Sequence, residues 1–470
     1  MFTIDSLSLS IYWYYAVWVA LLLCRRVDIS VIESYNLFVN ELDITGRAHF
    51  ILVETASAVS INYLLKGVCE MKKLLVVLLS ILCVLSLAGC SNGGGSNEGG
   101  NGGGDAPTED EVVFVKLGCS GPLSGDAKVY GEAVRNAAQI AVDEINASDS
   151  KIKFEFNMAD DEADGEKAVT AYSTLFDWGM QVSLFTVTSG SGAAVAALYD
   201  EDGIFAITPS GSATALVYTD EKNFASNFQM CFTDPNQGVA AADYIAQGFA
   251  DKAIAVLYKS DDVYSAGVYD KFNTEAGTKG LNVVYTGSFT DDSATDFSTQ
   301  LTAAKDAGAD LVFLPIYYQP ASLILKQAKD MGYAPTFFGV DGMDGILTLE
   351  GFDQSLAEGL YLITPFAADA DDELTKNFVS EYESRFGETP NQFAADAYDC
   401  VYAIHQALEN IGYHAGYATN GLNADLAAQF TSMTFNGLTG QNMTWAENGE
   451  VSKAPKAVII ENGVYVSVDE

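Results

Sequence analysis

The chain has 470 residues, of which 24 are Lys or Arg and 63 are Asp or Glu, and its formal net charge is −39. A surface this acidic repels the phosphates of nucleic acids and of anionic lipids, so we exclude nucleic acid as a partner. Seven acidic and six basic residues precede Cys90, which leaves 18 basic against 56 acidic side chains in the 381 residues from Cys90 onward. That stretch is long enough for two domains with separate cores.

An export signal begins at residue 71. Met71 and two lysines are followed by a mostly apolar run over residues 74–87 and then by Ala88-Gly89-Cys90. About fourteen apolar residues suit the core of a signal peptide but fall short of the ~20 that a membrane-spanning helix needs. The sequence Leu87-Ala88-Gly89-Cys90 matches the lipobox of bacterial lipoproteins, whose cysteine receives lipid. We therefore predict a signal peptide over residues 71–89, a lipid on Cys90, and an extracytoplasmic protein anchored to the cell membrane.

The segments on either side of this signal differ in composition. Residues 1–70 contain one aromatic and apolar patch over residues 11–24, followed by Arg25-Arg26. We interpret residues 1–70 as an upstream translation artefact, with Met71 as the true start; the alternative is a real extension whose first segment is a signal anchor. Residues 91–105 contain mainly Gly, Ser and Asn, so residues 90–111 are predicted to form a flexible tether with a typical reach of ~25 Å.

From residue 112 onward, short strand-like runs alternate with helical ones. Residues 112–117 and 151–156 read as strands, and Val134, Ala137, Ala138, Ala141 and Ile145 recur at the spacing of one helix face. Further strands are expected at residues 182–187, 204–208, 253–258, 281–286, 311–314 and 336–339. Strand–helix–strand order predicts an α/β fold with parallel sheets covered on both faces, and the number of strands favours two similar lobes.

Several kinds of chemistry find no support in the chain. Cys119, Cys231 and Cys400 remain after Cys90, an odd number without metal-ligand spacing, so we expect buried thiols, although a Cys119–Cys231 disulfide stays possible. The acidic run that starts at Asp160 has no glutamate at the last position of a calcium loop. No nucleotide-binding glycine motif is present, and the two histidines of this part share no motif with a serine nucleophile. We expect no metal, no cofactor and no enzymatic activity.

The loops that follow the predicted strands carry two complementary chemistries. Residues 118–125, 188–192 and 208–212 are rich in Ser and Gly and lead into helices, which suits the binding of an anion. Ordinary serine capping of helices explains any one of these loops equally well. Tyr264, Tyr317 and Asp341 follow later strands and offer aromatic walls and a carboxylate for a cation. Parallel sheets bind ligands at the carboxyl ends of their strands, so both groups are candidates for one site.

Seven short motifs carry a resemblance to a known family: residues 121–125 with 130–131, 203–209, 231–238, 339–343, 357–359, 437–440 and 445–449. Together they are specific, and the similarity covers nearly everything from residue 112 onward. The chain resembles the type I solute-binding proteins of ABC importers, in the branch of the leucine/isoleucine/valine-binding protein. The resemblance implies two Rossmann-like lobes joined by a hinge of three crossovers, near residues 232–236, 364–366 and 440–445. The first lobe would comprise residues 112–233 and 366–440, and the second residues 236–364 and 441–470.

The resemblance also implies roles for individual residues. Ser189 and Ser212, with backbone groups of Ser210 and Gly211, would hold the α-carboxylate of an amino acid. Asp341 would bind the α-ammonium group, and Tyr130, Tyr264 and Tyr317 would line the cleft. The chain departs from the family at Gln229, where an arginine is common, and at Asp341, where the leucine-binding relative has a glutamate.

The function implied is delivery of an amino acid, branched-chain or otherwise apolar, to an ABC permease and its ATPase. Two alternatives stay open at this point. The same fold can act as a ligand sensor, and an importer of this kind can carry a small amide, urea or an aromatic acid. A requirement for a paired carboxylate and ammonium group in the ligand would separate amino acids from those other cargoes.

Overall fold

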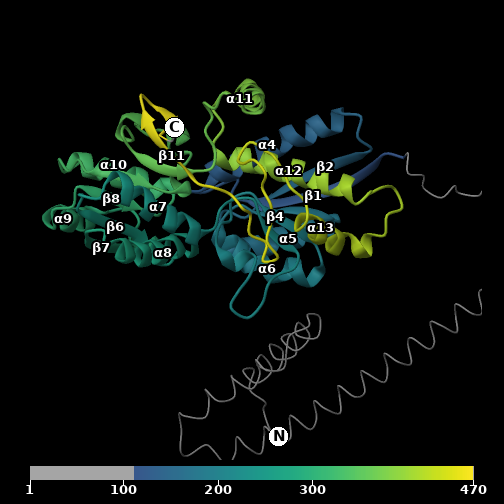
Figure 1. Cartoon of the computed structure of the whole chain (residues 1–470), viewed down its shortest axis with the longest axis horizontal. Coiled ribbons are helices and arrows are strands. Elements are labelled where there is room, and N and C mark those ends of the chain that lie inside the picture. The colour runs from purple at the N-terminus through teal and green to yellow at the C-terminus, as the bar shows by residue number, and fades with distance from the viewer. Residues whose placement is uncertain (1–110, 469–470) are drawn as a thin grey trace, which may run out of the picture. The chain divides into compact units, whose positions relative to one another are not determined.

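The computed structural model describes residues 111–468 (Figure 1). The predicted signal peptide, Cys90 and the Gly-rich tether up to residue 110 lie outside these residues. Among the described helices, none combines the length and the apolar character that crossing a membrane requires.

The first sheet has five strands, all parallel, in the order β2-β1-β3-β4-β5. Its strands are β1 (Val113–Gly121), β2 (Ile152–Asp160), β3 (Val182–Thr186), β4 (Phe205–Thr208) and β5 (Asn227–Gln229), and the helices between them are α4 (Lys128–Ala147), α5 (Gly165–Trp178) and α6 (Ser189–Asp202). We call this sheet with its helices the first lobe. Each parallel crossover passes through a helix or a helical turn, as the strand–helix alternation predicts.

The second sheet has seven strands in the order β12-β11-β10-β9-β8-β6-β7. Its strands are β6 (Ile254–Lys259), β7 (Val283–Phe289), β8 (Leu311–Leu314), β9 (Thr336–Gly339), β10 (Tyr361–Thr364), β11 (Lys456–Glu461) and β12 (Val464–Ser467), and its helices are α7 (Asp234–Gly248), α8 (Val263–Lys279), α9 (Ser298–Asp306) and α10 (Tyr318–Asp330). The strands are parallel except that β11 pairs antiparallel with both β10 and β12. We call this sheet with its helices the second lobe.

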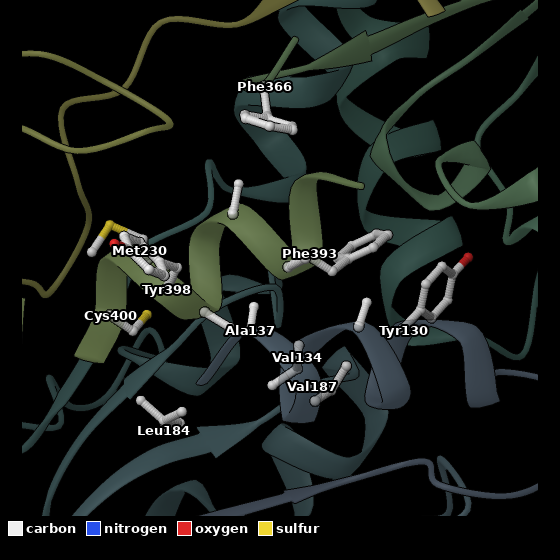
Figure 2. Packing of buried hydrophobic residues seen from close by; sticks show 14 of the residues in the cluster. Tyr130, Val134, Ala137, Leu184, Val187, Met230, Phe366, Phe393, Tyr398 and Cys400 are labelled. Atoms are coloured by element: carbon white, nitrogen blue, oxygen red, sulfur yellow. The ribbon is translucent and has the colours of Figure 1, made fainter. Parts of the chain in front are cut away.

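Helix α4 shows how the sequence dictates local structure. The five residues predicted to share one face of this helix are all buried, between 0 and 2% exposed. They face the sheet and α12 (Gln392–Asn410), which lies beside α4 in the core of the first lobe (Figure 2). Burial of such an apolar stripe supplies most of the stability of a helix in a globular protein.

Three segments connect the two sheets. The first follows β5 and leads into α7, and the second follows β10 and leads into α11 (Glu373–Phe386), α12 and α13 (Leu422–Phe430). These helices pack on the first lobe: the guanidinium of Arg385 lies 2.6 Å from Asp143 of α4, and the ring of Phe430 packs against Phe205 of β4.

The third connection lies further along the chain than the predicted residues 440–445. Trp445 packs on Phe430 with ring centroids 4.8 Å apart and donates its indole N–H to the carbonyl oxygen of Gln229 at 2.8 Å. The backbone N–H of Gln229 donates to the carbonyl oxygen of Gly449. These contacts keep residues 445–449 with the first lobe, and the chain joins the second sheet only at Lys456.

The predicted α/β fold with two sheets is confirmed, and each of the eight expected strand positions overlaps an observed strand. The strands β5, β10, β11 and β12 were not expected, because β5 has three residues and β10–β12 form an antiparallel edge outside the strand–helix alternation. Cys119, Cys231 and Cys400 are buried free thiols, and the possible Cys119–Cys231 disulfide is not formed.

Candidate functional site

A small cavity lies at the carboxyl ends of strands from both sheets. Its lining is made of Tyr130, Val187, Thr188, Ser189, Ser210, Ser212, Tyr264, Tyr317, Asp341, Gly342 and Phe393. The volume of the cavity, counted as the space open to the centre of a water molecule, is about 10 Å³. This is room for about one water molecule. Admission of a larger ligand therefore requires the lobes to move apart.

The first lobe contributes hydroxyl groups to this cavity. Ser189 is the first residue of α6, and its Oγ accepts a hydrogen bond from the amide of Ala213 at 3.1 Å. Ser210 Oγ donates to the carbonyl oxygen of Val187 at 2.6 Å. Thr188 Oγ1 is buried and has no hydrogen-bond partner within residues 111–468. This half of the cavity offers neutral dipoles, and none of its lining residues among those described is cationic.

Gly211 lies beside this wall but does not line the cavity. Its amide donates to Thr208 Oγ1 at 2.7 Å, and the amide of Ser210 donates to the same oxygen at 3.3 Å. A Cβ at Gly211 would lie 2.5 Å from a methyl group of Leu216 and 2.9 Å from Thr208 Oγ1, so a larger residue here would have to displace these side chains. Gln229, where the family often has arginine, donates its side-chain amide to the carbonyl oxygens of Gly211 and Ala213 and so holds this loop. The predicted contact of Gly211 with a ligand stays a prediction.

The second lobe contributes a buried carboxylate. Asp341 follows β9, is 3% exposed, and accepts hydrogen bonds from Tyr264 Oη to Oδ1 at 2.6 Å and from Gln237 Nε2 to Oδ2 at 2.7 Å. Burial raises the pKa of Asp341 to about 7, and the nearby Asp396 also raises it. The hydrogen bonds from Tyr264, Gln237 and the Gly342 backbone oppose the rise. Within residues 111–468, no basic side chain forms an ion pair with this carboxylate. Asp341 is therefore held by neutral donors alone.

Aromatic rings form the remaining walls and join the two lobes. Tyr264 and Tyr317 are stacked, with centroids 5.0 Å apart, and Tyr130 meets Tyr317 edge-on at 5.4 Å. Phe393, at the start of α12, lies beside Tyr130 with centroids 4.5 Å apart (Figure 2). Tyr130 comes from the first lobe, and its hydroxyl donates to the carbonyl oxygen of Gly342 in the second lobe at 2.5 Å. The cavity thus lies between the lobes, and Tyr130 closes one side of it.

The structure brings seven of the eight predicted ligand-binding residues to this cavity. They are Tyr130, Ser189, Ser210, Ser212, Tyr264, Tyr317 and Asp341. Sequence reasoning missed Val187, Thr188, Gly342 and Phe393 in the lining, and Gln237 behind it. Three of these had a signal, since Thr188 belongs to a predicted Ser/Gly loop, Gly342 follows Asp341, and Gln237 lies in the motif at residues 231–238. Phe393 had none, because only the packing of α12 on α4 brings it to the cavity.

The chain matches a family and individual proteins of that family. A family model described as "Periplasmic binding protein" matches residues 115–461. The leucine-, isoleucine-, valine-, threonine-, and alanine-binding protein of Pseudomonas aeruginosa is 26% identical over 301 residues, which cover 63% of this chain and 79% of that protein.

Solved structures agree with this match. The branched-chain amino acid transporter substrate-binding protein LivJ of Streptococcus pneumoniae, in complex with isoleucine, superposes with a TM-score of 0.66 at 25% identity and covers 76% of this chain and 100% of that one. A solute-binding protein of an ABC transporter from R. palustris, in complex with benzoate, has a TM-score of 0.68 at 19% identity, covers 76% of this chain and 96% of its own, and supports the fold alone. The chain therefore belongs to the periplasmic binding protein family, as a type I member similar to the leucine/isoleucine/valine-binding proteins, which bind solutes for transport and are not enzymes.

Proposed function

We propose that this protein binds a zwitterionic amino acid with an apolar, branched-chain side chain between its lobes and delivers it to an ABC permease and its ATPase. One observation carries the proposal: Asp341 is a buried carboxylate in the cavity wall whose hydrogen-bond donors are neutral. A buried carboxylate without a cation is costly, and a ligand ammonium group would supply the missing charge.

The opposite wall complements the other end of such a ligand. Ser189, Ser210 and Ser212 line it with hydroxyl groups near the start of α6, where backbone amides favour an anion. The positive end of the ligand would contact the second lobe and its negative end the first. A ligand that touches both lobes favours the conformation in which they are together, because only that conformation makes both sets of contacts.

The rest of the lining supports an apolar side chain. Val187, Phe393 and the tyrosine rings supply most of the remaining wall, and Asp341 is the one charged side chain in the lining that residues 111–468 form. The relative from P. aeruginosa is named for leucine, isoleucine, valine, threonine and alanine, and the structure from S. pneumoniae holds isoleucine. The branched and apolar members of this set, leucine, isoleucine and valine, form the ligand class that we propose.

Thermal unfolding with a panel of ligands tests the proposal. Leucine, isoleucine, valine, their amides, urea and benzoate would each be added in excess. A true ligand at a hundred times its Kd adds about 2.7 kcal/mol to the free energy of unfolding. We expect the free amino acids to stabilise the protein and benzoate, which has no ammonium group, to leave it unchanged. Stabilisation by an amide, urea or benzoate in place of the amino acids would contradict the proposal and support one of those cargoes.

Replacement of Asp341 tests the residue that carries the argument. Asp341→Asn should weaken binding of the amino acid by about 2–5 kcal/mol, because it removes one member of a desolvated charged pair. Isothermal titration calorimetry measures the change. Asp161→Asn is the matched control, since Asp161 is also a fully buried aspartate but does not line the cavity. Equal affinities of the Asp341→Asn variant and the unmodified protein would rule out the assigned role.

Anchoring through Cys90 is part of the proposed function and rests on the sequence 71–90. Lipid on Cys90 and the tether over residues 90–111 would hold the binding lobes at the membrane that contains the permease. Mass spectrometry of the natural protein tests this: we expect a first residue of Cys90 carrying lipid. A mature protein that retains any part of residues 1–89 would contradict it.

A further inference from the structure

Gln237 lies behind the cavity wall, at the point where the first connection becomes helix α7. It occupies the first turn of that helix and is 0% exposed. Its side-chain Nε2 donates to Asp341 Oδ2 at 2.7 Å, and its Oε1 lies 3.2 Å from Tyr264 Oη. Gln237, Tyr264 and Asp341 therefore form a closed triangle of hydrogen-bonding groups.

We propose that Gln237 is a positioning residue, which fixes the orientation of the Asp341 carboxylate and keeps it charged for the ammonium group of the ligand. This inference rests on the proposed function and adds a residue that does not line the cavity. Gln237 acts through Asp341 and makes no contact with the ligand itself.

The geometry of the triangle supports this role. Oδ1 of Asp341 accepts from Tyr264 and Oδ2 from Gln237, so the plane of the carboxylate is fixed, and the Gly342 backbone also favours the charged form. The Tyr264 hydroxyl has one proton and accepts from the amide of Gly342 at 2.9 Å. Its oxygen lies 2.6 Å from Asp341 Oδ1 and 3.2 Å from Gln237 Oε1, so the shorter contact takes the proton to Asp341. Loss of Gln237 would leave Oδ2 without its donor in a buried site. A hydrogen bond to a carboxylate favours the charged form, so its loss favours the protonated form.

Other titratable groups face Asp341 from several elements. Tyr130 from α4, Tyr264 from α8 and Tyr317 before α10 all have a pKa raised well above 10 by burial, and they stay neutral around pH 7. Asp396 faces it from α12 and is paired with Lys453.

Cys231 and Asp234 flank the same region from the first connection. Burial raises the pKa of each, and Asp341 raises both further. Because all of these groups are unchanged when Gln237 is replaced, a shift in the pH dependence of binding reports on the contact between Gln237 and Asp341.

The experiment measures the Kd for isoleucine by calorimetry between pH 5.5 and pH 9. For the unmodified protein we expect affinity to fall as the pH drops below about 7, because Asp341 becomes protonated. Gln237→Met keeps the unbranched shape and removes the donor. We expect its pH midpoint to lie about one unit higher, which makes binding about fivefold weaker at pH 7 and nearly unchanged at pH 9.

Two further variants make the outcome decisive. Gln392→Met is the matched control: Gln392 is also buried, but its Nε2 donates to the backbone oxygen of Asp341 at 3.1 Å and not to the carboxylate. Its pH midpoint should match that of the unmodified protein. Gln237→Glu has the same shape as glutamine and should move the midpoint upward as well, because two adjacent carboxyls cannot both ionise freely. This variant provides the test if Gln237→Met does not fold.

The possible results separate this inference from the proposed function. If the unmodified protein binds isoleucine and the folded Gln237 variants keep its pH midpoint, Gln237 is only structural and the inference is overturned. An equal shift in Gln392→Met would overturn it too, since the effect would not depend on the carboxylate contact. If the unmodified protein binds no amino acid, the proposed function fails as well. A shift seen only in the Gln237 variants supports the positioning role.

Discussion

One buried aspartate lies in the cavity wall and another lies on α12 beside the third connection, and the two are compensated in different ways. Asp396 on α12 forms an ion pair with Lys453, with Nζ 2.5 Å from Oδ1 and both side chains at most 1% exposed. Asp341 is buried to a similar degree, but within residues 111–468 its donors are the neutral groups of Tyr264, Gln237 and the Gly342 backbone. The charge of Asp396 is thus balanced by a lysine of the same chain. The charge of Asp341 is not balanced by a cation of the protein within residues 111–468. This arrangement is expected of a site that binds an ammonium group.

Neighbouring polar groups hold the Asp396–Lys453 ion pair in place. Lys453 Nζ also donates to Thr439 Oγ1 at 2.7 Å, so the cation has a second partner. Asp399, one helical turn from Asp396, accepts from Thr439 Oγ1 and from two backbone amides. These contacts join α12 to the residues that lead into the second sheet. A permanent pair at this place keeps the third connection fixed to the first lobe.

Replacement of Lys453 should have the largest effect on the free energy of unfolding. Lys453→Met would leave Asp396 buried without a cation, and breaking a buried pair in this way costs about 3–5 kcal/mol of unfolding free energy. Urea unfolding followed by circular dichroism measures the loss. The double variant Lys453→Met with Asp396→Leu should recover most of it, because no buried charge remains unpaired.

Lys456→Met is the matched control for that experiment. Lys456 is three residues further along the chain and exposed, so its loss should change the unfolding free energy by no more than about 0.5 kcal/mol. An equal loss in both lysine variants, or no recovery in the double variant, would show that the Asp396–Lys453 pair is not what distinguishes this region from the cavity.

Much of the fold could be predicted from local patterns, because those patterns have local causes. The apolar spacing along α4 identified its buried face, and the Ser/Gly loops identified the hydroxyl wall of the cavity. Asp341 was different, since a single aspartate in so acidic a chain carries little information without the resemblance to the family. Its burial and its neutral donors became visible only in the structure.

Contacts between distant residues account for what the sequence did not predict. Lys453 and Asp396 are 57 residues apart, and nothing near either residue indicates the pair. The position of the third connection depends on Trp445, which packs on Phe430 and bonds to Gln229, more than two hundred residues earlier. The antiparallel strands β11 and β12 join the sheet at its edge, where the strand–helix alternation gives no guidance.

The buried carboxylates should also affect, to a smaller extent, the pH dependence of stability without ligand. Burial raises the pKa of Asp396 as well, and Lys453 opposes that rise, whereas no cation among the described residues opposes it at Asp341. Burial raises the pKa of Asp341 to about 7 and those of Asp161, Asp344 and Asp399 to about 6, whereas unfolded aspartates titrate near 3.9. Between these values the folded state binds more protons than the unfolded state, so stability decreases as the pH rises from about 4 to 7.

Calorimetric unfolding at pH 5, 6, 7 and 8 measures this slope. We expect a higher unfolding temperature at pH 5 than at pH 8, because the uncompensated carboxylates are neutral at the lower pH. Asp341→Asn should flatten the slope between pH 6 and 7, where one such group contributes at most about 1.4 kcal/mol per pH unit. Asp161→Asn should act mainly below pH 6, since its pKa is lower. An unchanged slope between pH 6 and 7 in Asp341→Asn would show that Asp341 is not a buried carboxylate without a cation, and the contrast with Asp396 would disappear.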